Sequence, residues 1–88
     1  MSALKNNKIN TLVRLLNRGL TVEFKHDDLY YEIFESVEGG YVVNTYSSNE
    51  KDEDGEYVEA NLIDGGFCSG SARDAIKFII HNLVTVVT

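Results

Sequence analysis

The segment from Asp27 to Asp64 combines a high density of negative charge with apolar residues at the spacing of β-strands. Its charge is −11, because one lysine accompanies twelve acidic residues, whereas the whole chain carries −6. Side chains along a strand point alternately to opposite faces of a sheet, so the apolar residues can share one buried face. We therefore expect a folded sheet that carries the acidic residues, not a disordered acidic tail.

The size and composition of the chain favour a binding domain over an enzyme. With 88 residues, 43% of them hydrophobic, it can bury one thin core of helices on a sheet and has little volume left for a deep active site. The single cysteine, Cys68, cannot form an internal disulfide, which is typical of a reducing compartment. No stretch resembles a signal peptide or the roughly 18 apolar residues of a membrane span, so we expect a cytoplasmic protein. We expect neither a cofactor nor a bound metal.

Two segments have the apolar spacing of amphipathic helices. Residues 7–18 repeat apolar side chains every three or four positions, and Gly19 supplies the positive φ that ends a helix. Residues 72–83 carry a wider apolar stripe, and Ser71 and Asp74 have the spacing of a capping box at its start. The last five residues are β-branched and fit either the end of this helix or a short edge strand.

Between the helices, alternating apolar residues predict four strands joined by short connections. The expected strands cover residues 20–25, 29–37, 41–46 and 57–63. We expect turns at 26–28 and 38–40, an acidic loop at 47–55 and a glycine-rich loop at 65–70. The residues expected to face the core are Leu20, Val22, Phe24, Leu29, Tyr31, Ile33, Val37, Val58, Ala60 and Leu62.

The order αββββα predicts an α+β fold, with an antiparallel sheet of three to four strands and both helices packed on one face. The opposite face would then present aromatic and acidic side chains to solvent. These are Tyr30, Glu32, Phe34, Tyr46, Tyr57 and Glu59. Such a surface suits an arginine-rich partner, although rings that only cover the sheet would give the same pattern.

The acidic loop resembles a calcium-binding loop in part. Asp52, Asp54 and Gly55 fall at the third, fifth and sixth positions of an EF-hand. However, Glu50 stands at the first position, Asn61 stands where the bidentate glutamate is required, and no helix is expected on either side. A solvated acidic loop is the favoured interpretation.

Two other candidate sites rest on residue types alone. Cys68 together with His26 or His81 would supply a thiol nucleophile and its base, but the spacing shows neither a neighbouring base nor an oxyanion pocket. The glycine-rich segment 65–71 precedes a helix and could hold an anion there. It lacks the lysine of a P-loop, so a plain strand-to-helix connection is favoured. His81 is interpreted as a residue at the edge of the core, or one that interacts with the C-terminal end of the helix dipole, and not as a ligand.

Three motifs in the first half of the chain resemble small phage anti-CRISPR proteins that inhibit Cas9. They are Ile9-Asn10-Thr11-Leu12-Val13-Arg14, Leu20-Thr21-Val22-Glu23 and Glu38-Gly39-Gly40-Tyr41-Val42-Val43, and the similarity covers about residues 8–44. The resemblance implies an acidic protein whose carboxylates mimic DNA and occupy the basic surface that reads the PAM. The phosphate mimics that it implies are Asp27, Asp28, Glu38, Asp52, Glu53 and Asp54.

We therefore expect a non-catalytic protein, encoded by a phage or mobile element, that binds a basic protein surface and inhibits a nucleic-acid-binding host defence protein. It would not bind nucleic acid itself, since its charge repels phosphates. The alternative is a self-associating structural or regulatory module, a homodimer that pairs through an aromatic face or an edge strand. The expected partner-binding residues are Asp27, Asp28, Glu32, Glu38, Tyr46, Glu50, Asp52, Glu53, Asp54, Glu56, Tyr57 and Glu59.

Overall fold

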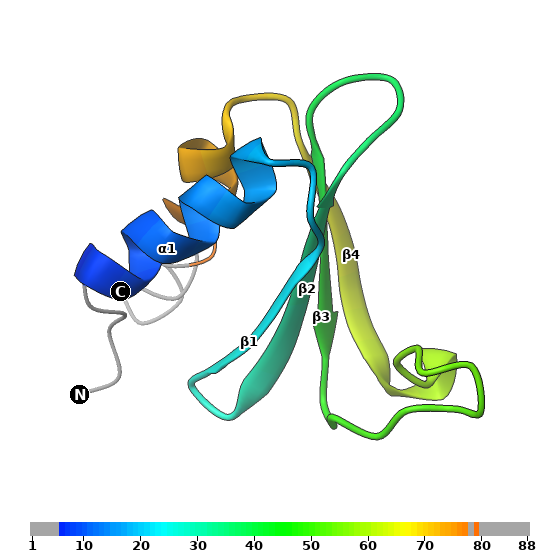
Figure 1. Ribbon diagram of the computed structural model, residues 1–88. Coiled ribbons are helices and arrows are strands. Elements are labelled where there is room, and N and C mark those ends of the chain that lie inside the picture. The colour runs from blue at the N-terminus through cyan, green and yellow to red at the C-terminus, as the bar shows by residue number, and fades with distance from the viewer. Residues whose placement is uncertain (1–5, 78, 80–88) are drawn as a thin grey trace.

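The computed structural model describes residues 6–77 and 79, which form an antiparallel sheet with helices on one face (Figure 1). The elements are α1 (Asn6–Asn17), β1 (Val22–His26), β2 (Leu29–Glu35), β3 (Tyr41–Tyr46), the 3₁₀ turn η1 (Glu59–Asn61) and β4 (Leu62–Cys68). Residues 72–77 and 79 are helical as well. The strands lie in the order β1-β2-β3-β4, so each pairs with its neighbour in sequence. The predicted α+β fold is confirmed.

Helix α1 ends where the sequence indicates. Gly19 adopts φ of +83°, and its N–H donates to the carbonyl of Leu16 at 2.9 Å. The N–H of Leu20 reaches the carbonyl of Leu15 at 3.1 Å, which completes a Schellman motif. Leu20 therefore belongs to the helix end and not to a strand, and it is largely exposed instead of facing the core as predicted.

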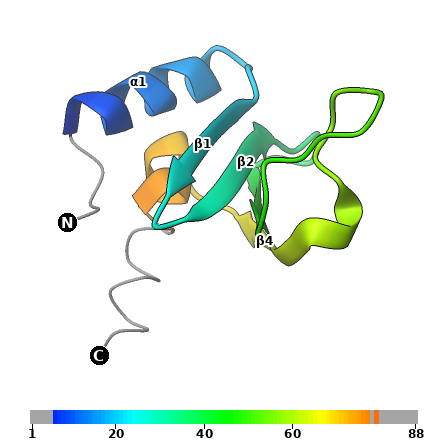
Figure 2. The same ribbon diagram turned by 90° about the horizontal axis from the view of Figure 1, so that it is seen from below.

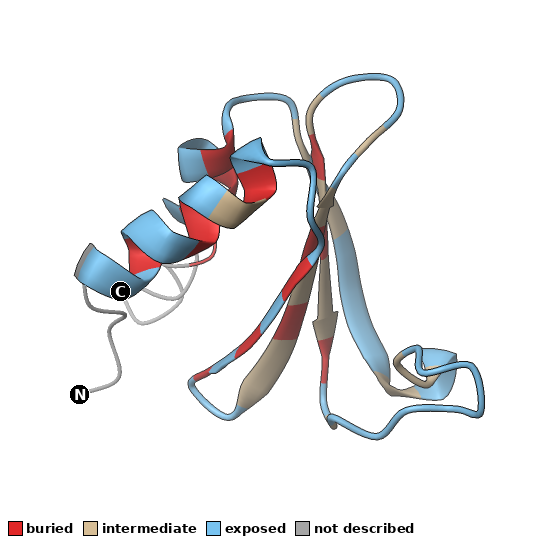
Figure 3. Ribbon diagram, in the orientation of Figure 1, coloured by how far each residue is buried: buried red, intermediate tan, exposed pale blue. Residues whose placement is uncertain are grey.

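The core lies between the helices and one face of β1, β2 and β3 (Figure 3). It consists of Ile9, Leu12, Val13, Leu16, Val22, Phe24, Tyr31, Ile33, Tyr41, Val43, Ala72, Ala75, Ile76 and Ile79. The rings of Phe24 and Tyr31 stack at 5.4 Å across β1 and β2. The predicted apolar stripes of both helices are thus confirmed as far as residue 79. The rest of the predicted second helix, with His81 and the ambiguous residues 84–88, lies outside the described residues.

The predicted capping box at the start of the second helix is confirmed. The backbone N–H of Asp74 donates to Ser71 Oγ at 3.2 Å, and the N–H of Ser71 donates to Asp74 Oδ2 at 3.1 Å. A Cβ atom on Gly70 would lie 2.5 Å from Asp74 Oδ2, so a side chain there would displace the capping carboxylate. Because the chain's own carboxylate caps this helix start, the structure favours the predicted plain connection over the alternative of an anion site in the glycine-rich segment.

The first two strands differ from their predicted bounds. Strand β1 continues through His26, which is buried, so the turn is only Asp27–Asp28. Both turn residues have positive φ, 54° and 65°, as a two-residue hairpin turn that matches the twist of the strands requires. Strand β2 stops at Glu35, and Val37 is fully exposed in the next turn instead of facing the core.

The fourth strand lies further along the chain than predicted. It covers residues 62–68, not 57–63, and the glycine-rich stretch predicted as a loop forms half of it. Val58 is half-buried outside the sheet, whereas Ala60 and Leu62 are exposed, so none of the three faces the core. Strand β4 is defined by its backbone pairing with β3. Gly65 and Gly66 in its middle have no side chains, so the sequence there lacks the alternation of apolar and polar residues by which a strand is recognised.

Candidate protein-binding surface on the open face of the sheet

The connection between β3 and β4 folds back across the face of the sheet opposite the helices, which we call the open face (Figure 2). The acidic loop, predicted at residues 47–55, extends to residue 58 in the structure, and the name refers to residues 47–58 of this connection. Its lysine, Lys51, places Nζ 2.6 Å from Oε1 of Glu23 on β1. Because β2 lies between β3 and β1, the loop must span β2 to make this ion pair.

Two aromatic rings attach the acidic loop to the sheet. Tyr57 of the loop stacks on Tyr46 at the end of β3, with the ring centroids 4.5 Å apart and an interplanar angle of 19°. Lys51 Nζ lies 4.7 Å from the centroid of the Tyr57 ring, and Lys51 and Tyr57 also form a backbone bridge. Tyr46 is consequently buried under the loop, although the sequence predicted it as part of an exposed face.

The tip of the acidic loop is held by its own carboxylate. Asp52 Oδ1 accepts hydrogen bonds from the backbone N–H of Asp54 at 2.9 Å and of Glu56 at 3.1 Å. The N–H of Asp52 donates to the carbonyl of Glu56 at 2.8 Å, and Gly55 closes the turn with φ of +80°. Asp52 therefore orders the loop tip, and the neighbouring residues Glu53, Asp54 and Glu56 remain exposed to solvent.

The calcium alternative would require this same aspartate as a ligand. One of its two oxygens already accepts two backbone N–H bonds. Over the part of the chain that the structure describes, no three His, Cys, Asp or Glu side chains form a group that could hold a metal ion.

An open cleft of about 590 Å³ lies between the loop tip and the open face. Its lining residues are Thr21, Glu23, Glu32, Phe34, Asn44, Tyr46, Asp54, Gly55 and Glu56. Four of them are carboxylates, supplied by β1, β2 and the acidic loop. Among the described residues, Glu23 alone of these four has a lysine as its partner. Carboxylates converging on a concave surface focus a negative potential there and attract cationic groups.

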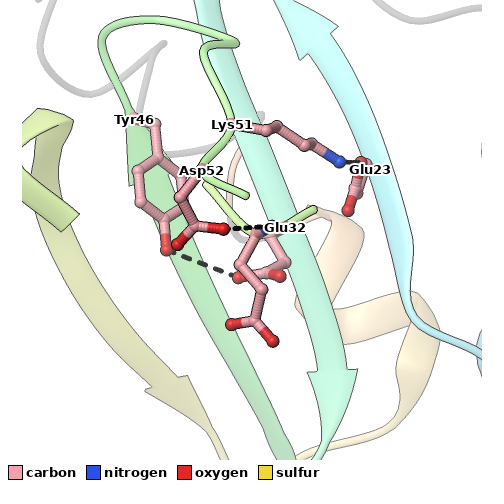
Figure 4. Close-up of polar contacts among 6 residues, drawn as sticks. Glu23, Glu32, Tyr46, Lys51 and Asp52 are labelled. Carbon is pink, nitrogen blue, oxygen red and sulfur yellow. Dashed lines mark hydrogen bonds and ion pairs between the residues drawn. The ribbon is translucent and has the colours of Figure 1, made fainter. Parts of the chain in front are cut away.

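Glu32 lines the cleft, and its charge affects the pKa of the neighbouring Tyr46 (Figure 4). Its Oε1 accepts hydrogen bonds from Tyr46 Oη and Asn44 Nδ2, both at 3.4 Å. Burial, followed by the charge of Glu32 and this hydrogen bond, raises the pKa of Tyr46. Burial and the charge of Glu23 raise the pKa of Tyr57 in the same way. Both hydroxyls therefore stay protonated over a wider pH range than in the unfolded chain.

We expect the protein to lose stability at alkaline pH. The pKa of Tyr31 is raised as well, mainly by burial, and that of Lys51 is raised mainly by its hydrogen bond to Glu23. A raised pKa means that the folded protein holds its proton where the unfolded chain, with tyrosine near pKa 10, has lost it. The contribution is complete below about pH 10 and is lost as the pH rises further.

This pH dependence can be measured as a melting temperature. We expect Tm to fall as the pH is raised from roughly 8 to roughly 11. Substitution of Tyr46→Phe removes one of the titrating groups and should make the fall shallower. An alkaline slope that this substitution leaves unchanged would contradict the assigned role of Tyr46.

The structure brings together most of the predicted partner-binding residues, but not all. Glu32, Tyr46, Asp54 and Glu56 line the cleft. Beside them in the chain, the acidic loop also carries Glu50, Asp52, Glu53 and Tyr57, and Glu59 begins η1 close behind it.

Three predicted residues lie in turns at the ends of the sheet. Asp27 and Asp28 form the β1–β2 turn at one end, whereas Glu38 lies in the β2–β3 turn at the other (Figure 1). Asp28 lies 3.9 Å from Lys25, but both side chains are exposed, so the pair contributes little to stability. The twelve acidic residues of segment 27–64 therefore do not share one surface, because successive hairpin turns lie at opposite ends of the strands.

Sequence reasoning missed Glu23 as a member of the site. This residue lies outside the acidic segment, yet the alternation of β1 places it opposite the buried Val22 and Phe24, on the open face. The available signal was therefore its position on the strand, not the local charge density. Asn44 was missed because it is uncharged, although its position on β3 also places it on the open face.

The thiol alternative finds no base in the described part of the chain. Cys68 is half-buried in β4 and packs against the core. His26 lies on β1, the opposite edge of the sheet, so three strand spacings of roughly 4.8 Å separate the two strands. The pairing registers also place the two residues near opposite ends of the sheet.

None of the helices in the described ranges, 6–77 and 79, is long and apolar enough to cross a membrane. Comparisons with models of protein families, with curated proteins and with solved structures gave no match to this chain.

Proposed function

We propose that this protein is a non-catalytic binding protein that uses its open face and acidic loop to dock on a basic, arginine-rich protein surface. The observation that carries the proposal is the convergence of four carboxylates on one cleft whose outer wall is a loop attached to the sheet. Carboxylates at the end of a flexible tail would have no such shared geometry.

The chemistry of the cleft suits guanidinium groups. Glu32, Asp54 and Glu56 have no lysine or arginine partner among the residues that the structure describes. A carboxylate can accept two parallel N–H bonds from an arginine, and the planar guanidinium also stacks on aromatic rings such as Phe34. An arginine-rich partner is therefore favoured over one that carries only lysines.

The attachment of the loop supports tight binding. Ordering a free loop on association reduces affinity, because conformational entropy is lost at that step. Here the Tyr46–Tyr57 stack and the Lys51–Glu23 ion pair hold the loop before any partner arrives. The carboxylates at the loop tip are then presented in a fixed arrangement.

The kind of partner follows from the charge pattern together with the resemblance to anti-CRISPR proteins. A protein groove that binds nucleic acid is lined with arginine and lysine aimed at phosphates, and a fixed array of carboxylates can occupy it instead. We propose that the protein is encoded by a phage or mobile element, acts in the host cytoplasm, and inhibits a Cas9-type nuclease or another nucleic-acid-binding defence protein by mimicking DNA.

The proposal is tested by binding to a purified Cas9-type nuclease loaded with its guide RNA. We expect the dissociation constant to rise steeply as salt is added, because the contacts are mostly between charges. Duplex target DNA bound in advance should block the interaction. An affinity independent of salt, or no competition with DNA, would exclude DNA mimicry on that nuclease.

Two charge-matched double variants locate the surface. Asp54→Asn with Glu56→Gln removes two carboxylates from the cleft, and we expect the dissociation constant to rise by about tenfold or more. Glu35→Gln with Glu38→Gln removes the same charge near the β2–β3 turn, and we expect a change below about twofold. Equal losses for the two variants would show that net charge, and not the cleft, governs binding.

A further inference from the structure

Strand β4 is an edge of the sheet with an apolar, nearly uncharged surface. Within residues 6–77 and 79, no strand pairs with its outer side. Ile63 and Phe67 expose 56% and 57% of their surface, and Asp64 is the only charged residue of the strand. An exposed apolar edge strand is a template for pairing with another strand unless charges or bulges protect it.

The hydrogen bonds inside the sheet show which backbone groups of β4 point outward. The N–H of Ser47 donates to the carbonyl of Asn61, so the odd-numbered residues of β3 bond toward β4. Their partners in β4 are the even-numbered residues Asp64, Gly66 and Cys68. The intervening odd-numbered residues, Gly65 and Phe67, therefore direct their N–H and C=O groups away from β3.

We propose that β4 pairs antiparallel with β4 of a second copy of this chain, about a twofold axis at Gly65. The two four-stranded sheets then form one continuous sheet. In this register Phe67 lies opposite Ile63 of the second copy, which joins two exposed apolar side chains. Asp64 lies opposite Gly66 of the second copy, so the negative charge of one strand never faces that of the other.

A second copy is favoured over another partner at this edge because β4 pairs with itself in charge and in apolar side chains. Each copy carries a net charge of −6, so two copies repel unless their contact surface is nearly neutral, as β4 is. Strand β1, the other edge, alternates charged residues with buried ones and ends beside the Lys25–Asp28 pair. Charged edges resist pairing, so association through β4 closes as a dimer and does not continue into a filament.

The β-bulge near the start of β4 marks one end of the proposed paired region, which runs from Ile63 to Phe67. The register with β3 shifts between Thr45 and Tyr46, which leaves Ile63 as the extra residue. A twofold axis perpendicular to the sheet keeps each face of the sheet on one side. The open faces of the two copies would therefore lie side by side, and the dimer would present two acidic clefts to the same side.

Sedimentation velocity from about 1 µM to 1 mM tests the dimer. We expect the mass to rise from one to two chains, and the association to strengthen with added salt, because salt screens the repulsion between two acidic chains. This salt dependence has the opposite sign to that of binding to a basic partner, so failure of the dimer and failure of the proposed function are distinguishable.

A pair of lysine variants locates the contact. Phe67→Lys places a charge on the β4 edge and should weaken dimerisation by about tenfold or more. Val37→Lys adds the same charge at a fully exposed turn residue and should change it by less than about twofold. Circular dichroism confirms that both variants fold. A dimer that responds equally to the two substitutions would overturn the assignment to β4.

Cross-linking tests the register without relying on either variant. In a Cys68→Ser background, Gly65→Cys places two thiols directly opposite across the axis, at a Cα separation of roughly 5.5 Å that suits a disulfide. Oxidised glutathione should then give a covalent dimer. Gly66→Cys is the control, because that position faces Asp64 of the second copy. Equal yields would overturn the register. A monomer at every concentration, the outcome if another part of the same chain covers this edge, would overturn the proposal.

Discussion

Replacement of Gly40 with alanine is expected to lower the free energy of unfolding by about 3 kcal/mol. Gly40 has φ of +78°, and an L-residue there is strained by about 1 kcal/mol or more. A Cβ atom would also lie 2.6 Å from the carbonyl oxygen of Cys68 and 2.7 Å from Cζ of Phe67. The ring can move aside but the backbone oxygen cannot, so the end of β4 must shift, at about 1–3 kcal/mol.

Gly39 provides the matched control for this substitution. It lies in the same turn with φ of +95°, but a Cβ atom there would meet nothing within 4 Å. Gly39→Ala should therefore lower the free energy of unfolding by only about 1 kcal/mol, from backbone strain alone. Urea denaturation of the two variants measures the difference. Equal losses would show that the close approach of Gly40 to β4 contributes nothing to stability.

Replacement of Tyr57 with alanine is expected to release the acidic loop from the sheet. The substitution removes the stack on Tyr46 and the contact with the Lys51 ammonium group. Because the main core lies on the other face of the sheet, we expect the free energy of unfolding to fall by only about 1–2 kcal/mol. Cleavage within the loop by a glutamate-specific protease should become about tenfold faster or more, since such cleavage follows local opening.

Tyr57→Phe separates the role of the ring from that of the hydroxyl group. Phenylalanine retains the ring that stacks on Tyr46, so its loop should resist the protease as the native loop does. On a basic partner, Tyr57→Ala should raise the dissociation constant by about tenfold without changing any charge, because the loop must be ordered on binding. If alanine and phenylalanine gave equal binding, the attachment of the loop would be irrelevant to recognition.

Local patterns were sufficient for the helices and the first three strands. The stripe of α1 and the stop at Gly19 depend on contacts within a few residues, as do the capping box at Ser71 and the hairpin turn before β2. Their free energies come from neighbouring residues, and the sequence displays those neighbours directly. The bounds of the first two strands changed where a helix cap or a turn included an apolar residue, as at Leu20 and Val37, and where β1 continued through His26.

The last strand and the site depended on contacts between distant parts of the chain. Strand β4 contains two glycines and is identified by its hydrogen bonds to β3, which no local pattern records. The alternation in residues 57–63 does not correspond to a buried strand face, because Ala60 and Leu62 are exposed and Tyr57 packs on Tyr46 from outside the sheet. Likewise, Glu23 joins Glu32 and the acidic loop only because β1 and β2 pair and the loop returns across them.

The amino-acid sequence by itself determined the class of fold, the order of the helices and strands, the buried stripes of the helices, and the presence of many carboxylates on a folded scaffold. Only the tertiary structure decided which carboxylates meet. It separated Glu38 from the acidic loop, added Glu23 to the cleft and buried Tyr46 beneath Tyr57. The physical reason is that helix stripes and turns are stabilised by residues close in sequence, whereas a surface is assembled by strand pairing and loop packing between residues far apart.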